Sequence, residues 1–187
     1  MLLTPYKGAI MNEIRIHFKV EDEIAPFEYI GVSTRLSGNA DKLIIKSPIP
    51  LVEGKRYFGK GKVATEKYVG ADQKSHLSTY IRLAESEILS NANYNQELNE
   101  CNIIGVVCKH YPTRVTTTGI EITEFVLRYA DGKKNYYIPC IAFMKAKLQI
   151  DDEIKVFGRL QSRVYRNTRG ETKTAYELAV IRMNKEN

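Results

Sequence analysis

The chain has 187 residues, of which 43% are hydrophobic, and its formal net charge is +6. This length and composition are typical of a globular protein with one large domain or two small ones. No apolar run reaches the roughly 18 to 20 residues that span a bilayer, and no signal peptide is expected from the N-terminal sequence. Cys101, Cys108 and Cys140 form no CxxC pair, which argues against a disulfide framework or a zinc site and favours a reducing cytoplasm.

The positive charge is concentrated in the second half of the chain. Residues 1–99 carry 13 Lys+Arg and 12 Asp+Glu, a net charge of +1, whereas residues 100–187 carry 15 and 10, a net charge of +5. A basic excess confined to one half favours a polyanionic partner for that half.

Pro, Gly, Asn and Asp divide the chain into short segments in which apolar and polar residues alternate, the pattern of half-buried strands. In the first half, strands are predicted over 12–20, 27–35, 42–47, 54–68 and 77–88. The polar segment 90–100 then indicates a linker. In the second half, strands are predicted over 102–109, 120–129, 135–143, 153–165 and 174–183. Because segment 144–149 leaves room for at most a turn or two of helix, the chain is predicted to be all-β.

The two halves repeat the same layout in the same order. Aligning Gly61 with Gly158 superimposes the fourth strands, and Tyr68 then meets Tyr165. An internal repeat of five strands predicts two tandem five-stranded barrels of the OB type, which is a partly open Greek-key barrel. The predicted organisation is an N-terminal OB-like domain at 1–90, a linker at 91–100 and a C-terminal OB domain at 101–187.

The fourth strand of the second half has two unlike faces, because alternate side chains of a strand point to opposite sides. One set is small and apolar. The other set is basic and aromatic, and consists of Lys155, Phe157, Arg159, Arg163 and Tyr165 around Gln161. Proteins that bind single strands combine cations, which neutralise phosphates, with rings on which bases stack. This face is expected to be exposed and predicts a single-stranded nucleic acid as the partner.

Five segments of the second half resemble one known family. They read NIIGVV (102–107), GIEITEFVLRYA (119–130), YIPCIAF (137–143), VFGRLQSRVY (156–165) and TAYELAV (174–180). Together they resemble the bacterial single-stranded DNA-binding protein and its primosomal relatives over residues 102–183. The resemblance implies an OB-fold that oligomerises and wraps single-stranded DNA. It also implies stacking roles for Tyr137, Phe143 and Tyr165, although the family often has Trp at such positions and this chain has none.

Two features depart from the family pattern. The family's Gly- and Pro-rich tail with its acidic end has no counterpart, since the sequence stops at VIRMNKEN, directly after the last predicted strand. This departure favours an auxiliary protein of a phage, plasmid or other mobile element over a housekeeping protein. The connection between the third and fourth strands is short, as in the primosomal relatives.

Cations and rings in the neighbouring loops complete the predicted site. They are Tyr111, Arg114, Lys133, Lys134, Arg166 and Arg169. The first half has a weaker equivalent surface made of Phe58, Lys60, Lys62 and Tyr68, in which Glu66 takes the place of Arg163. We therefore expect the first half to bind DNA less strongly and to supply much of the contact in a homodimer, which would bring four OB-folds together.

An enzyme is not expected. His17, His76 and His110 lack the spacing of a metal site or a catalytic triad, and the acidic residues at 151–153 fit a turn better than a magnesium site. No cofactor, metal, membrane or small-molecule substrate is therefore predicted. The alternative functions are a primosome-type adaptor that touches DNA in passing and an assembly protein whose OB-folds bind another protein.

Overall fold

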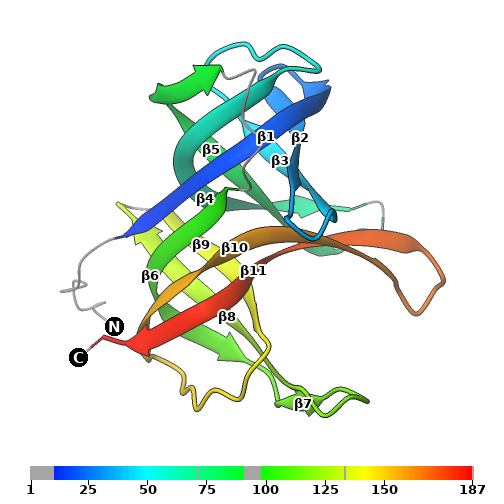
Figure 1. Cartoon of the computed structure of the whole chain (residues 1–187). Helices are drawn as coiled ribbons and strands as arrows, with labels where there is room; N and C mark the ends of the chain where they lie inside the picture. The colour runs from blue at the N-terminus through cyan, green and yellow to red at the C-terminus, as the bar shows by residue number, and fades with distance from the viewer. Residues whose placement is uncertain (1–10, 71, 91–97, 133, 187) are drawn as a thin grey trace.

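In the computed structural model, residues 11–186 are described apart from 71, 91–97 and 133, and every regular element among them is a strand (Figure 1). This confirms the prediction of an all-β chain. None of the described residues belongs to a helix that is long and apolar enough to cross a membrane. The strands are β1 (Asn12–Ala25), β2 (Glu28–Thr34), β3 (Ala40–Lys46), β4 (Arg56–Val69), β5 (Ser75–Ser90), β6 (Asn99–His110), β7 (Arg114–Val115), β8 (Glu121–Asp131), β9 (Lys134–Ala142), β10 (Glu153–Arg166) and β11 (Thr172–Lys185).

The strands pair in two closed circuits of five. In the first circuit, β1, β2, β3, β5 and β4 are neighbours in that order, and β4 pairs again with β1. In the second circuit, β6, β8, β9, β11 and β10 follow the same order, and β10 pairs again with β6. One pair in each circuit is parallel, β3 with β5 and β9 with β11. A closed barrel of five strands agrees with the predicted OB architecture.

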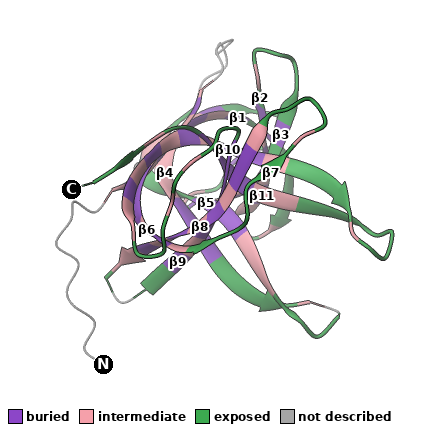
Figure 2. Cartoon of the chain, turned by 90° about the horizontal axis from the view of Figure 1, so that it is seen from below, coloured by how far each residue is buried: buried purple, intermediate pink, exposed green. Residues whose placement is uncertain are grey.

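Alternation of buried and exposed side chains explains why these segments form barrel strands. Along β1, Ile14, Ile16 and Phe18 are buried, whereas Arg15 and Lys19 are exposed. Apolar residues on one side of each strand fill the inside of a circuit, and polar residues on the other side contact water. The buried apolar residues of both circuits form one large core, which Figure 2 shows along the inner parts of the strands.

An antiparallel ladder between β1 and β6 joins the two circuits into one sheet of eleven strands. It runs from the pair Asn12 and Ile103 to the pair Ile16 and Asn99. Asn12 and Asn99 therefore lie at opposite ends of the ladder, as a two-fold axis through its centre requires. Of the predicted linker, residues 91–97 lie outside the described residues, whereas Asn99 and its neighbour at position 100 belong to β6.

Two buried asparagines make the same contacts in the two circuits. The Asn12 side chain donates to the carbonyl oxygen of Val63 at 2.7 Å and accepts from its N–H at 2.9 Å. Asn99 makes the same two hydrogen bonds with Leu160, at 2.7 and 3.0 Å. Since Val63 and Leu160 occupy equivalent positions of the sequence repeat, the repeat extends to the buried contacts that hold the strands together.

Each circuit also needs a glycine shortly before this contact. Gly61 and Gly158 lie where the register shifts between β4 and β5 and between β10 and β11. A Cβ on either glycine would collide with a backbone carbonyl oxygen of the neighbouring strand, that of Arg82 or of Ala179. The strands therefore approach closely and bend at equivalent places in both circuits.

Two hairpins extend beyond the circuits. We call residues 66–78, apart from residue 71, the first arm, and residues 163–175 the second arm. Both arms reach toward the same side of the molecule (Figure 1), and most of their residues are exposed, as the colouring of Figure 2 shows. The turns of the two arms have the same hydrogen bond. The N–H of Gly70 donates to the carbonyl oxygen of Lys74, and the N–H of Asn167 donates to the carbonyl oxygen of Glu171, each at 3.0 Å.

Candidate nucleic-acid interface

The predicted basic and aromatic face of β10 is divided in the structure. Lys155 and Phe157 line a pocket of about 510 Å³ that also involves β6 and β11. Tyr165 lies at the other end of the strand, in the second arm. Between them, the register shift after Phe157 and the twist of a long strand turn the later side chains toward different surroundings.

Arg159 joins the two circuits. The sequence predicted an exposed side chain, and this prediction is wrong, because the side chain is 18% exposed and its Nη2 donates to Asp41 at 3.0 Å. Asp41 is 1% exposed and also accepts hydrogen bonds from Arg35, at 2.7 and 3.0 Å, and from the backbone N–H of Ser162, at 3.1 Å. Asp41 lies on β3, so this carboxylate fixes β10 of the second circuit against the first. The predicted contact of Arg159 with phosphate stays a prediction.

Arg163 has an acidic neighbour within its own hairpin. Glu177 is buried and accepts hydrogen bonds from Arg163 Nε at 3.2 Å and from Gln161 Nε2 at 3.1 Å. Gln161 is therefore buried, although the sequence placed it on an exposed face. The Arg163 guanidinium lies 5.6 Å from the centre of the Tyr165 ring, so a cation and a ring are adjacent at the surface of the second arm.

Three tyrosines of the second circuit that are not buried each have a cation over the ring, and we call them the ring–cation pairs. The distances from cation to ring centre are 4.7 Å for Lys109 and Tyr111, 5.8 Å for Lys67 and Tyr137, and 5.6 Å for Arg163 and Tyr165. Lys67 belongs to the first arm, so its pair crosses between the circuits. The contact of Lys67 with Tyr137 was not predicted, because Tyr137 lies in the other half of the chain and a period-two pattern relates only neighbours along one strand.

Most of the predicted loop cations are exposed. Lys134 lies 5.1 Å from the centre of the Tyr136 ring, and Arg166 and Arg169 lie at the end of the second arm. Lys133 lies outside the described residues. Several cations of the second circuit have no carboxylate within 4.0 Å among the residues that the structure describes, namely Lys109, Arg128, Lys134, Arg166 and Arg169. Arg128 is the cross-strand partner of Tyr137, which places it beside a ring–cation pair.

Arg114 and Phe143 lie near the ends of β8 and β9. Arg114 donates two hydrogen bonds to Glu124, at 3.1 and 3.2 Å, which raise the pKa of the guanidinium. Glu124 therefore offsets part of the positive charge of Arg114, which was predicted to contact phosphate. Phe143 is exposed directly after β9, where its ring is accessible.

The predicted second surface, on the first circuit, is dispersed. Lys60 pairs with Glu13 at 3.2 Å, and Lys62 pairs with Asp131 at 3.0 Å. The hydrogen bond between Lys62 and Asp131 raises the pKa of the amine and lowers that of the carboxyl group. Both lysines therefore serve contacts within the protein.

Phe58 and Tyr68, the rings of this second surface, lie in different surroundings. Phe58 packs edge-on against His17, with 5.6 Å between ring centres. Tyr68 lies in the first arm and stacks on His76 at 5.4 Å. Tyr68 is the member of this predicted surface that reaches the region between the arms.

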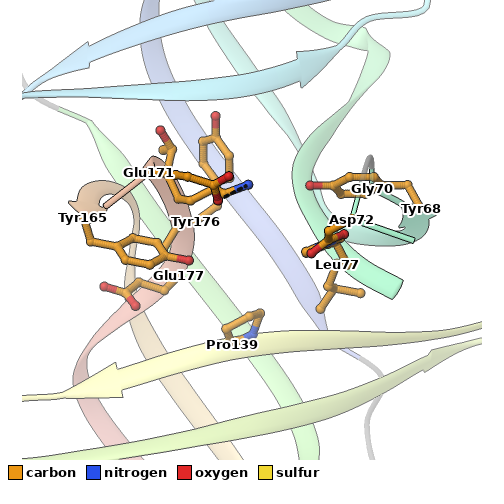
Figure 3. Close-up of a pocket in the computed structure, with 13 residues that line it drawn as sticks. Tyr68, Gly70, Asp72, Leu77, Pro139, Tyr165, Glu171, Tyr176 and Glu177 are labelled. Atoms are coloured by element: carbon orange, nitrogen blue, oxygen red, sulfur yellow. Dashed lines mark hydrogen bonds and ion pairs between the residues drawn. The ribbon is translucent and has the colours of Figure 1, made fainter. Parts of the chain in front are cut away.

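A groove of about 430 Å³ lies between the two arms (Figure 3), and we call it the inter-arm groove. Its lining includes Tyr68 and His76 from the first arm, Tyr165, Tyr176 and Glu177 from the second arm and the strand that follows it, and Pro139 from β9. From the sequence, Tyr68 and Tyr165 were predicted to lie on separate surfaces. In the structure they lie on opposite walls of one groove.

The charged groups of the inter-arm groove are paired within the protein. Asp72 Oδ1 lies 2.7 Å from His76 Nε2, and this hydrogen bond lowers the pKa of Asp72. Glu171 lies 3.7 Å from Lys173. Burial raises the pKa of Tyr176, so its phenol stays neutral near pH 7. The charged side chains of the groove thus have contacts within the protein, and its tyrosine rings are exposed beside them.

The fold is similar to that of the single-stranded DNA-binding protein from Thermus aquaticus. The wild-type crystal structure matches with a TM-score of 0.72 and 13% identity, over 96% of this chain and 95% of that chain. A deletion variant of the same protein matches with a TM-score of 0.69 and 13% identity, over 95% of each chain. No protein-family model and no curated protein match the sequence. At this identity the similarity shows a shared fold, and the predicted resemblance in fold to single-stranded DNA-binding proteins is confirmed.

Proposed function

We propose that this chain is a non-enzymatic protein that binds single-stranded DNA without strong sequence preference. The observation that carries the proposal is the set of three ring–cation pairs on the second circuit. Each pair supplies a ring on which a base stacks, worth about 1–3 kcal/mol per base, and a cation that attracts a phosphate. Bases in a duplex already stack on one another, so the rings favour the single strand.

The positions of the ring–cation pairs support the same function. OB-folds bind oligonucleotides across strands 2 and 3 and the loops that follow strands 1 and 4. In the second circuit, Tyr111 lies in the loop after β6, Tyr137 lies on β9 and Tyr165 lies in the second arm. The rings thus line the surface that an OB-fold uses for single strands.

Within this proposal the two circuits are tandem OB-folds, with domains at 1–90 and 101–187, and the first binds DNA more weakly. Two copies form a homodimer that brings four OB-folds together, since two-fold dimers are the commonest closed assembly. The protein protects or organises single strands during replication, recombination or repair, and the expected setting is a phage, plasmid or other mobile element. The free thiols of Cys101 and Cys140, both buried, support a cytoplasmic location. No cofactor takes part.

A second candidate function is that of an adaptor or assembly protein whose main partner is another protein. The pocket beside Lys155 and Phe157 favours it, because Met144, Ile181 and Met183 line the same hollow. Met144 and Ile181 are exposed. Exposed apolar side chains around a hollow suit a protein partner better than a phosphate backbone.

Binding of fluorescent oligo-dT and of duplex DNA of equal length, each at two salt concentrations, tests the proposed function. If about five to seven cations contact phosphates, log K falls with log salt with a slope of about −3.5 to −5. Preference for the single strand with such a slope supports the proposal. Equal affinity for both DNAs, or a flat salt response, contradicts it and favours the protein adaptor.

A further inference from the structure

The inter-arm groove is built from both circuits. Tyr68 comes from β4 in the first arm, and Tyr165 comes from β10 in the second arm. The two rings lie on opposite sides of the groove, and Figure 3 shows their hydroxyl groups pointing toward one another across the gap. The two residues are 52% and 40% exposed, so both rings are accessible to a ligand.

The inter-arm groove suits a flat group without charge. Its volume of about 430 Å³ lies within the range of about 300–1,000 Å³ that is usual for small-ligand sites. Pro139 contributes an apolar surface at its floor. Asp72 lies in hydrogen-bond contact with His76, and Glu177 is paired with Arg163, so both carboxylates are engaged within the protein.

Cations lie in the turns of both arms, beyond the walls of the groove. Lys74 is in the turn of the first arm, and Arg166 and Arg169 are at the end of the second. Among the described residues, no carboxylate lies within 4.0 Å of the charged group of any of the three, although the backbone N–H of Lys74 donates to Asp72 at 3.1 Å. Within a strand, each flat, neutral base has a phosphate on either side along the backbone. The tyrosine rings of the groove suit the base, and the cations of the two turns suit the flanking phosphates.

Contacts within the protein place the two walls before a ligand arrives. Near the base of the first arm, the Thr65 hydroxyl accepts a hydrogen bond from the backbone N–H of Tyr137 at 2.9 Å. Near the base of the second arm, Asp41 holds Arg159 and Ser162. A site that is already assembled loses little conformational freedom when it binds.

We propose that the inter-arm groove is a composite subsite in which one base of the bound strand lies between Tyr68 and Tyr165. This inference rests on the proposed function. It adds that the two circuits bind one strand jointly, because the strand crosses from the second circuit to the first through the groove. Tyr68 is then part of the principal site instead of a separate, weaker surface.

A double-mutant cycle on the full chain tests the composite subsite. Affinity for fluorescent oligo-dT is measured for the wild type, Tyr68→Ala, Tyr165→Ala and the double variant. Each single substitution is expected to weaken binding about 5- to 140-fold, because it removes a stacking ring. The affinity of the double variant is expected to be about equal to that of the single variant with the lower affinity, because both substitutions remove contacts with the same base.

Tyr111 supplies the matched control, since it is a similarly exposed tyrosine of the second circuit that lies outside the groove. The losses from Tyr111→Ala and Tyr165→Ala are expected to multiply, as they do for independent sites. Tyr68→Phe and Tyr165→Phe keep the ring and remove only the hydroxyl group that points into the groove, so each is expected to bind more tightly than the corresponding alanine variant. Thermal unfolding of every variant separates a lost ring from a lost fold.

The outcomes distinguish this inference from the proposed function. If the wild type binds oligo-dT but the losses at Tyr68 and Tyr165 multiply, or if either alanine variant binds normally, the composite subsite is overturned and the proposed function stands. If the wild type does not bind oligo-dT, both are overturned. Photo-crosslinking from a single iodouracil supplies a direct check. Crosslinks from one nucleotide to both tyrosines support the subsite, and crosslinks to them only from separate nucleotides overturn it.

Discussion

The two circuits place different charges at the base of their arms. In the first circuit, Lys46 lies between Glu28 and Glu66, at 2.8 and 2.9 Å, so one cation faces two carboxylates and the group is negative. At the position of Glu66, the second circuit has Arg163, whose guanidinium lies beside the Tyr165 ring. Because Lys46 is shared by two carboxylates, it offsets the charge of Glu66 only in part, and the predicted repulsion of phosphate by Glu66 is weakened. The excess of positive charge in the second half thus coincides with rings that have a cation beside them.

This comparison separates the residues that make the fold from those that vary on its surface. The contacts of Asn12 and Asn99, the glycines at the register shifts and the closure of the arms are alike in both circuits. The outward charges differ. Buried contacts therefore define the shared scaffold, and the cations beside accessible rings are a surface feature in which the two circuits differ.

The largest expected effect comes from breaking the contact between the circuits. Asp41→Ala removes a buried carboxylate that accepts hydrogen bonds from Arg35, Arg159 and the Ser162 N–H. Removing one partner of a buried ion pair costs about 3–5 kcal/mol, and we expect the lower end because Arg159 keeps some access to water. Urea unfolding measures the loss, and Asp41→Asn, which retains one acceptor oxygen, should lose less. A loss below about 1 kcal/mol, the value of an exposed pair, would show that Asp41 does not hold the circuits together.

The next effect tests whether the scaffolds are equivalent. Asn12→Ala and Asn99→Ala each strand a buried backbone N–H and carbonyl group, and each is expected to lower the free energy of unfolding by about 2 kcal/mol. Urea unfolding of the two variants should give similar losses. A large loss at one position with little change at the other would mean that the two circuits depend on different contacts, despite their matching geometry.

A third experiment sharpens the difference in surface charge. Replacing Arg166 and Arg169 with Ala is expected to make the salt slope of oligo-dT binding less steep by about 1.4, at about 0.7 per lost phosphate contact. The matched control is the double alanine variant of Lys60 and Lys62, whose partners are carboxylates, and its slope should change much less. Equal changes in the two double variants would mean that both circuits meet the DNA backbone alike.

The smallest expected effect concerns the second ion pair between the circuits. The hydrogen bond from Lys62 holds the pKa of Asp131 below its ordinary value of 3.8. The folded chain therefore favours the ionised carboxylate, and this stabilisation is present above about pH 3.8 and is lost as the pH falls through the lower, folded pKa. Because both groups are partly exposed, the effect should be below about 1 kcal/mol. Unfolding measured between pH 6 and pH 3 should show this loss in the wild type, and Asp131→Asn should lack that part of it.

The strands could be predicted from the sequence because their pattern is local. Alternating burial and turn residues placed a strand at 77–88, which the structure extends to Ser75–Ser90, and one at 153–165, which it extends to Glu153–Arg166. The pairing of β1 with β6 has no such local pattern. It depends on two strand edges that are far apart in the chain, so the arrangement of the circuits could not be derived from periodicity.

The surroundings of the site residues were harder to predict for the same reason. The sequence shows which side of a strand Arg159 occupies, but not that β3 lies opposite. One signal was present, since Asp41 shares its side of β3 with the buried Leu43 and Ile45, and a carboxylate among buried residues requires a partner. The meeting of Tyr68 with Tyr165 depends on both arms and on the joined sheet, and it had no counterpart in the sequence pattern.

The ladder between β1 and β6 forms within one polypeptide. Its strands therefore meet at an effective concentration that linkage raises to about the millimolar range, however few copies of the protein are present. Two separate chains, each forming one circuit, would associate only to the extent that their concentration allowed. If they formed a symmetric pair, both would need the same amino-acid sequence. Fusion in a single chain removes both constraints. The joined sheet survives dilution, and each half of the gene accumulates surface substitutions independently of the other.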